Sequence, residues 1–194
     1  MIHPHTELRF ISDEIGHGIV ATQFIPKGTI TWVQDKLDMV YTQTQVDEMT
    51  DYYKNLIDYY TFRNQKGDYI LCWDLAKYVN HSFKSNCLTT PYDFEIAIRD
   101  ILPGEELTDD YGYLNIAKPF IPKDEGTERK VVYPDDLLNY HKQWDKAIAD
   151  AFQFIGKIKQ PLFDLLPEKT IQTIEKIKKG VKPLDSILIC YFSG

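Results

Sequence analysis

The hydrophobic pattern of this chain changes character close to Gly112, and that change limits the folds that the chain can adopt. Before Gly112, short apolar runs alternate with tight turns that contain Gly and Pro, apart from one helical stretch over residues 45–60 with Thr44 as its expected N-cap. The expected strands cover residues 8–10, 16–21, 30–33, 69–73 and 94–99, the last with one buried face. We therefore predict a mainly β domain with some α-helix, built from short twisted sheets, for residues 1–113.

Residues 114–194 are predicted to form a mostly helical C-terminal extension. A polar connection over residues 119–126 leads to apolar and aromatic side chains that recur every three to four residues from Leu137 to Ile155. A second helix is expected to be interrupted at Pro167 and to end near Gly180.

Three polar or glycine-containing stretches stand out in the first domain. The stretch from Tyr78 to Cys87 places two apolar residues ahead of side chains that can hydrogen-bond local backbone, so a plain loop is one interpretation. Upstream of it, Gly16-His17-Gly18 leads into an apolar strand and a Pro-Lys-Gly turn. Downstream, residues 106–112 read Glu-Leu-Thr-Asp-Asp-Tyr-Gly after a Pro-Gly turn. Their order along the chain favours a functional interpretation.

Together these stretches resemble the SET-domain lysine methyltransferases, whose hallmarks are a GxG turn, an NHSxxxN segment and a closing ELTxDYG segment. The resemblance covers roughly residues 8–113. It implies a SET-domain β-fold in which the closing segment threads under the loop that carries NHS, in a knot-like arrangement. It also implies S-adenosylmethionine as the cofactor and a lysine side chain of a protein as the methyl acceptor.

The resemblance further implies which residues bind the cofactor. Gly16, His17 and Gly18 would line it mainly through backbone groups, as glycine allows because its backbone can approach a ligand closely. Asn80 would anchor the methionine portion, and the backbone of His81 would hold the adenine.

Tyr111 would be the catalytic tyrosine at the inner end of a lysine channel, in contact with the cofactor as well. Methyl transfer is an in-line displacement, so holding the two reactants in a near-attack geometry lowers much of its barrier. A lysine with an ordinary pKa of about 10.4 must lose its proton first, and an apolar aromatic channel favours the neutral amine. The aromatic residues that could supply its walls, most of them expected to be ordinary core or surface residues, are Tyr52, Tyr53, Tyr59, Tyr60, Tyr69, Trp73, Tyr111 and Tyr113.

Departures from the family pattern leave alternatives open. No YxG element is present, the cysteine-rich post-SET zinc segment is absent, and Asp109 stands where members often carry the Phe or Tyr that limits the number of methyl groups. The degree of methylation therefore stays open. So do two rival functions, an inactive SET-like interaction module and a methyltransferase acting on a small amine. The helical extension could close the channel, pack independently against the domain, or bind a partner protein.

The net charge of −7 argues against direct nucleic-acid binding, which requires a basic surface. Acidic residues crowd the stretch from Asp93 to Asp110, which suggests either a solvated face or attraction of lysines in basic protein segments. No apolar run approaches the ~20 residues of a membrane-spanning helix, and no secretory signal is visible. We expect a soluble cytoplasmic protein, or a nuclear one if the source is eukaryotic.

The three cysteines form no CxxC pair, which argues against both a disulfide framework and a structural zinc site. His3 and His5 could bind a metal, but a disordered N-terminus is the expected alternative. No metal site is predicted.

Overall fold

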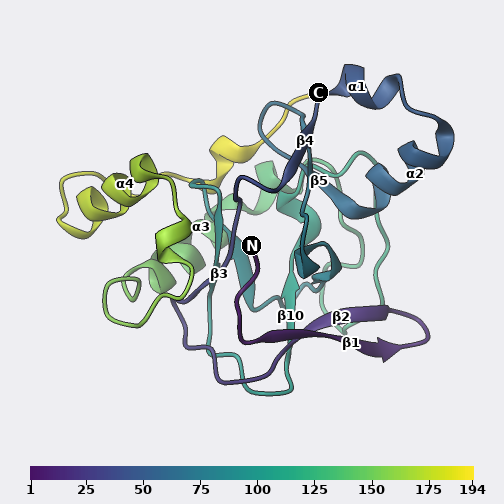
Figure 1. Cartoon of the computed structure of the whole chain (residues 1–194). Helices are drawn as coiled ribbons and strands as arrows, with labels where there is room; N and C mark the ends of the chain where they lie inside the picture. Colours follow the sequence, from purple (N-terminus) through teal and green to yellow (C-terminus); the bar gives the residue numbers. More distant parts are fainter.

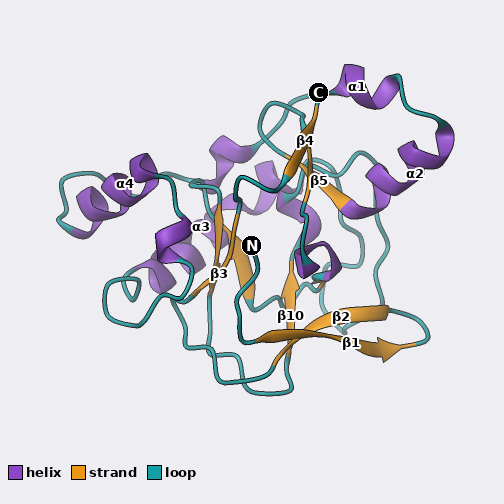
Figure 2. Ribbon diagram, viewed as in Figure 1, coloured by secondary structure: helices purple, strands orange, loops and turns teal.

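A computed structural model describes residues 1–194 as three small sheets, with the α-helices of residues 136–178 on one side and those of residues 43–60 on another (Figures 1 and 2). The sheets have the strand orders β1-β2-β10-β7, β3-β9-β8 and β4-β6-β5. The strands are β1 (Thr6–Ser12), β2 (Gly16–Ala21), β3 (Ile30–Val33), β4 (Met39–Tyr41), β5 (Thr61–Arg63), β6 (Tyr69–Leu71), β7 (Asn80–His81), β8 (Cys87–Thr89), β9 (Phe94–Ala97) and β10 (Glu106–Asp109). The α-helices are α1 (Gln43–Asp47), α2 (Asp51–Tyr60), α3 (Asp136–Phe152) and α4 (Glu168–Lys178), and four 3₁₀ turns are η1 (Leu75–Tyr78), η2 (Tyr111–Tyr113), η3 (Phe163–Leu165) and η4 (Ile187–Cys190). The predicted mixture of short sheets and helices is confirmed.

The helix expected over residues 45–60 is two helices. Thr42, not Thr44, begins α1, because its hydroxyl accepts from the Gln45 amide while the Gln45 side chain accepts from the Thr42 amide. Thr50 then adopts an extended conformation, with φ −69° and ψ 157°, and restarts the chain as α2. The capping box at Thr42 and the extended backbone at Thr50, neither of which the apolar spacing shows, therefore set the starts of the two helices.

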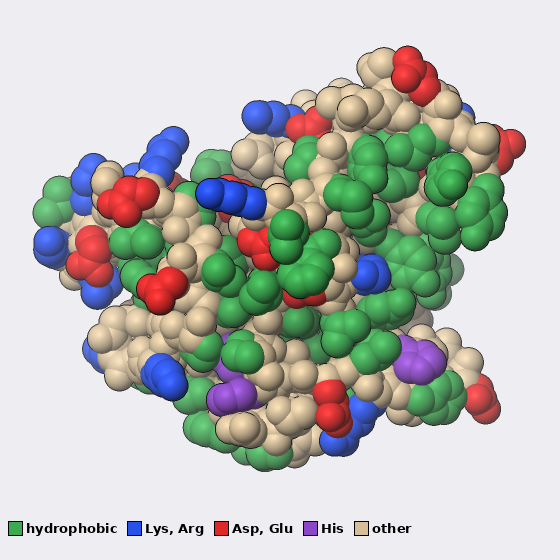
Figure 3. Space-filling view, viewed as in Figure 1, with side chains coloured by type: hydrophobic (Ala, Val, Ile, Leu, Met, Phe, Trp, Pro, Cys, Tyr) green, Lys and Arg blue, Asp and Glu red, His purple; other side chains and the backbone are tan.

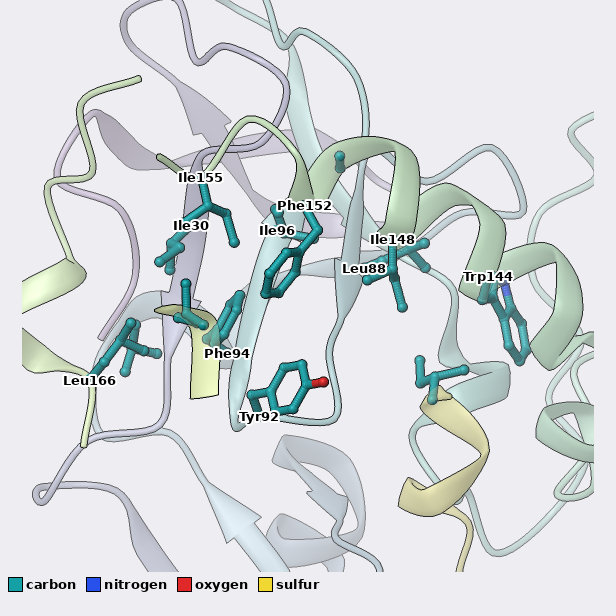
Figure 4. Close-up of a cluster of buried hydrophobic side chains, with 14 of the residues drawn as sticks. Ile30, Leu88, Tyr92, Phe94, Ile96, Trp144, Ile148, Phe152, Ile155 and Leu166 are labelled. Atoms are coloured by element: carbon teal, nitrogen blue, oxygen red, sulfur yellow. The ribbon is translucent and has the colours of Figure 1, made fainter. Parts of the chain in front are cut away.

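Strand β9 is buried on both faces, where the sequence predicted one buried face. Phe94 and Ile96 point toward α3 and pack with Ile148 in the larger hydrophobic cluster (Figure 4). Ala97, on the opposite face, packs in a second cluster with Leu107 of β10. The prediction was wrong because the periodicity of a strand does not reveal that a second sheet covers its other face.

Helices α3 and α4 complete the core of the sheet β3-β9-β8. The larger cluster joins Ile30 and Leu88 of that sheet to Trp144 of α3 and Ile174 of α4. The C-terminal region thus buries its apolar residues in the same core as the β-rich region, whereas the domain boundary at residue 113 stays a prediction. No helix of the structure combines the length and apolarity that crossing a membrane requires.

The N-terminus is ordered rather than disordered. Ile2 forms a β-bridge with Trp32, and the amide of the buried His3 donates to the Thr31 carbonyl at 2.8 Å. Burial, followed by the charge of His5, lowers the pKa of His3 to about 4, so His3 is a neutral core residue.

Candidate functional site

Strand β10 brings the three stretches together because it lies between β2 and β7. It pairs antiparallel with β2, where Leu107 lies opposite Ile19, and parallel with β7, where Thr108 lies opposite Asn80. Asn86 secures the loop after β7: its Nδ2 donates to the Glu106 carbonyl at 2.7 Å, and its Oδ1 accepts from the Thr108 amide at 2.9 Å. The loop is therefore fastened along β10, and the threading of one segment under the other stays a prediction.

The two glycines of the GxG turn are required for different reasons. Gly16 has φ +82° and nothing within 4 Å of the position of an added Cβ, so it serves the backbone conformation and leaves open space. An added Cβ on Gly18 would lie 2.2 Å from Glu106 Oε1 and 2.7 Å from Asn80 Nδ2. The second glycine thus makes room for two polar side chains.

Asn80 joins this turn to β10. Its Nδ2 donates to the His17 carbonyl at 3.0 Å and to Glu106 Oε1 at 2.7 Å. Both amide protons are therefore used by the protein, and the amide oxygen is left as an acceptor for a ligand.

His81 is neutral and has one unpartnered nitrogen. Its Nδ1 accepts from the Tyr111 amide at 3.1 Å. Burial, and next the positive charge of Arg129, lowers the pKa of His81 to about 4. The proton of the neutral ring therefore lies on Nε2, which is buried and has no hydrogen-bond partner. A buried unsatisfied donor at this place suits a ligand that supplies an acceptor.

The Tyr111 hydroxyl is held by the chain just ahead of β7. It donates to the Val79 carbonyl at 2.9 Å, and the Tyr111 ring lies 5.3 Å from the His81 ring between centroids. Burial, followed by the charge of Asp109, raises the pKa of Tyr111, so the hydroxyl stays protonated. Its oxygen lone pairs remain free to accept hydrogen bonds or to face a positive charge.

Asp109 is turned into the protein rather than toward solvent. Its carboxylate accepts from the Tyr113 hydroxyl at 2.9 Å, and the carboxyl group of Glu95 of β9 lies near it. Burial raises the pKa of Asp109 to about 6, and burial and then the charge of Asp109 raise the pKa of Glu95 well above its usual range. Burial and the like charge of the neighbouring carboxyl group therefore both favour a protonated form in this pair.

Replacing Asp109 by Asn is expected to raise the melting temperature at pH 8 and to change it little at pH 4. The folded-state pKa of Asp109 lies above its unfolded value, so the stability that its protonated form provides is lost as the pH rises through about 6. Asparagine cannot ionise, yet its oxygen can still accept from Tyr113. Thermal melts of both proteins from pH 4 to 8 measure this, and a variant that tracks the wild type across the whole range would contradict it.

The aromatic residues named from the sequence divide between surface, core and site. Hydrophobic side chains gather on the surface over β4, β5 and α2 (Figure 3), where Tyr52, Tyr53 and Tyr59 are exposed. Tyr60 lies nearer the site, with its ring 5.9 Å from that of Tyr78, the residue that precedes Val79. Sequence reasoning did not single out Tyr78, although its position just before Asn80 was a usable signal.

The acidic stretch from Asp93 to Asp110 does not form one exposed face. Asp109 and Asp110 are buried, and Glu105 forms an ion pair with Arg99. Asp109, Asp110 and Glu95 thus serve the interior, a role that a charge count along the sequence does not reveal.

Comparison with known protein families identifies a match within this chain. A model described as the SET domain matches residues 16–112, a range that contains the GxG turn, the Asn80 loop and the Tyr111 segment. No curated protein matches the chain.

Proposed function

This chain belongs to the SET-domain family, and on that premise we propose that it transfers methyl groups from S-adenosylmethionine to lysine side chains of a protein substrate. Members of this family are in general methyltransferases. The observation that supports the proposal best is the Tyr111 hydroxyl, held by the Val79 carbonyl where the three matched stretches meet.

The residues around Tyr111 fit the proposed cofactor. Gly16 leaves open space beside the turn, Asn80 presents a free amide oxygen, and His81 has a buried N–H without a partner. These groups would bind a ligand that combines an amino acid portion with a nitrogen-rich ring. When bound, S-adenosylmethionine supplies an electrophilic methyl group on a positively charged sulfur.

The protein would contribute position and a suitable local polarity. Because Tyr111 stays protonated and already donates to Val79, its oxygen is oriented to accept from, or to face, the reacting groups. Tyr60 and Tyr78 supply aromatic surface on the side of Val79. An amine placed against such surface is poorly hydrated, which favours its neutral, nucleophilic form. Orientation of the two reactants then lowers the barrier.

Incubation of the protein with labelled S-adenosylmethionine and host lysate tests the activity and the substrate class together. We expect label in discrete protein bands and, after hydrolysis, in methyl-lysine. Label confined to small molecules would favour the rival methyltransferase of small amines. The absence of label would favour an interaction module without activity.

Calorimetry tests the cofactor separately. We expect the wild type to bind S-adenosylmethionine and Asn80→Ala to bind it more weakly, because the substitution removes the amide oxygen and the bridge from His17 to Glu106. A wild type that produces no heat of binding in several buffers would overturn the proposed cofactor.

We also propose that the acceptor lysines lie in basic protein segments. The protein carries a net charge of −7, so basic segments are attracted to it over a range set by salt, about 8 Å at physiological ionic strength. Methylation of a basic peptide should therefore fall as salt rises, whereas an acidic peptide of the same length should react more slowly throughout. Equal rates for both peptides, independent of salt, would argue against this substrate class.

A further inference from the structure

Arg129 lies in the connection between η2 and α3 and contacts two buried carboxylates. Its guanidinium forms ion pairs with Asp110 and Asp136, whose side chains are each only 3% exposed. Nη2 also lies 3.3 Å from the second oxygen of Asp110. Buried carboxylates are tolerated when they are paired and hydrogen-bonded, so Arg129 is the cation that allows these two to lie together.

Aromatic rings from two parts of the chain surround the same guanidinium. Its central carbon lies 4.5 Å from the ring centroid of Phe83, which follows β7, and 4.4 Å and 5.8 Å from those of Tyr140 and Trp144 on α3. Cations over aromatic faces are attracted by the ring quadrupole, and Arg is well suited to such stacking. Arg129 therefore connects α3 to the loop that carries His81.

The first path from Arg129 to Tyr111 runs through Asp110. The Asp110 Oδ1 accepts from the Gly112 amide at 3.0 Å and so caps η2, the turn that begins at Tyr111. An added Cβ on Gly112 would lie 2.9 Å from Arg129 Nη2, which shows how closely the backbone of this turn approaches the guanidinium. The backbone on either side of Tyr111 is thus held by one ion pair.

The second path runs through the rings. Phe83 packs edge to face against His81 at 4.5 Å, and His81 Nδ1 accepts from the Tyr111 amide. Arg129 stacks on the same Phe83 ring and so helps to hold it against His81. Both paths end at the backbone of the residue whose hydroxyl bonds to Val79.

We propose that Arg129 is a positioning residue for the methyl transfer, because it fixes the backbone that aims the Tyr111 hydroxyl. The effect on rate rests on the proposed function, while the effect on the backbone does not. Three residues of α3, Asp136, Tyr140 and Trp144, contact Arg129. Helix α3 therefore helps to position Tyr111 and does not only pack against the β-rich region.

Arg129→Ala in the full chain tests the proposal, with Lys130→Ala as the matched control. Lys130 is the next residue and also forms an ion pair, with Asp124, but both side chains of that pair are exposed. We expect single-turnover methyl transfer to fall at least about 10-fold in Arg129→Ala, with S-adenosylmethionine affinity within a few-fold, and to stay unchanged in Lys130→Ala.

Added guanidinium at a non-denaturing concentration should restore part of the rate of Arg129→Ala by occupying the space that the arginine side chain leaves. Arg129→Lys, which keeps the charge but not the planar fork, should be intermediate and serves as the test variant if the alanine protein does not fold.

Hydrogen exchange separates this proposal from the proposed function. The amides of Tyr111 and Gly112 should exchange at least about 10-fold faster in Arg129→Ala than in the wild type, and at the wild-type rate in Lys130→Ala. A wild type without methyltransferase activity would remove the proposed function, and the exchange rates would still decide the role of Arg129. Wild-type exchange at both amides in a folded Arg129 variant would overturn the proposal. So would a rate loss that guanidinium does not restore and that merely follows a lower melting temperature.

Discussion

Tyr111→Phe is expected to lower single-turnover methyl transfer by about 100-fold or more while leaving S-adenosylmethionine affinity within a few-fold. Phenylalanine keeps the ring and its packing against His81 but deletes the oxygen that bonds to the Val79 carbonyl. If that oxygen orients the reacting groups, its loss affects the reaction and not the fold. Rapid-quench kinetics with labelled cofactor, calorimetry and a melting curve on the same preparation measure the three quantities.

Tyr113→Phe is the matched control because Tyr113 lies in the same 3₁₀ turn, two residues further on. Its hydroxyl is buried, donates to Asp109 and accepts from the Asp110 amide at 3.1 Å, so its removal should cost stability, on the order of 1 kcal/mol, and should lower the rate far less than Tyr111→Phe does. A folded, cofactor-binding Tyr111→Phe that turned over near the wild-type rate would exclude Tyr111 from the mechanism. Tyr60 and Tyr78 would then be the next tyrosines to test for a role in the reaction.

Gly18→Ala is expected to weaken S-adenosylmethionine binding by about 10-fold or more, a larger effect than on folding. The new methyl group would meet Glu106 Oε1 at 2.2 Å and Asn80 Nδ2 at 2.7 Å, and both atoms end side chains that can move. Their movement relieves the clash but breaks the bond from Asn80 to the His17 carbonyl. The substitution should therefore disorder the turn that we propose lines the cofactor, which calorimetry measures directly.

Gly16→Ala is the matched control for Gly18→Ala, because it tests the effect of backbone conformation without a steric clash. Gly16 has room for a methyl group but a φ of +82°, so alanine there should cost on the order of 1 kcal/mol of stability through strain. Combining Gly18→Ala with Glu106→Ala removes the nearest clash and should recover part of the affinity. Wild-type binding by Gly18→Ala would show that the side chains give way without affecting the cofactor site.

The parts of the structure that the sequence predicted are those that local pattern determines. Strands β2 and β3 begin and end at the predicted residues. The convergence of the GxG turn, the Asn80 loop and the Tyr111 segment was also predicted, although by the family resemblance and not by spacing. Their roles in binding and catalysis stay predictions.

The parts that the sequence did not predict depend on groups distant along the chain. Asp109 looked like part of an acidic surface because its neighbour Glu95 lies on β9, in a different sheet from β10, and only the packing of the two sheets brings these side chains together. No local pattern distinguishes Arg129, which pairs with Asp110, nineteen positions earlier. A charge count cannot distinguish a solvated residue from one that neutralises a buried partner.

The central place of β10 in its sheet has a consequence for how the chain folds. Until residues 106–109 are available, β2 lacks its second neighbour and β7 lacks the strand with which it pairs. Exposed strand edges of this kind invite pairing with other chains, and contacts between residues far apart in sequence form slowly. During synthesis the nascent chain therefore passes through a period with open edges, which closes when β10 inserts, and only then do His17, Asn80 and Tyr111 become neighbours.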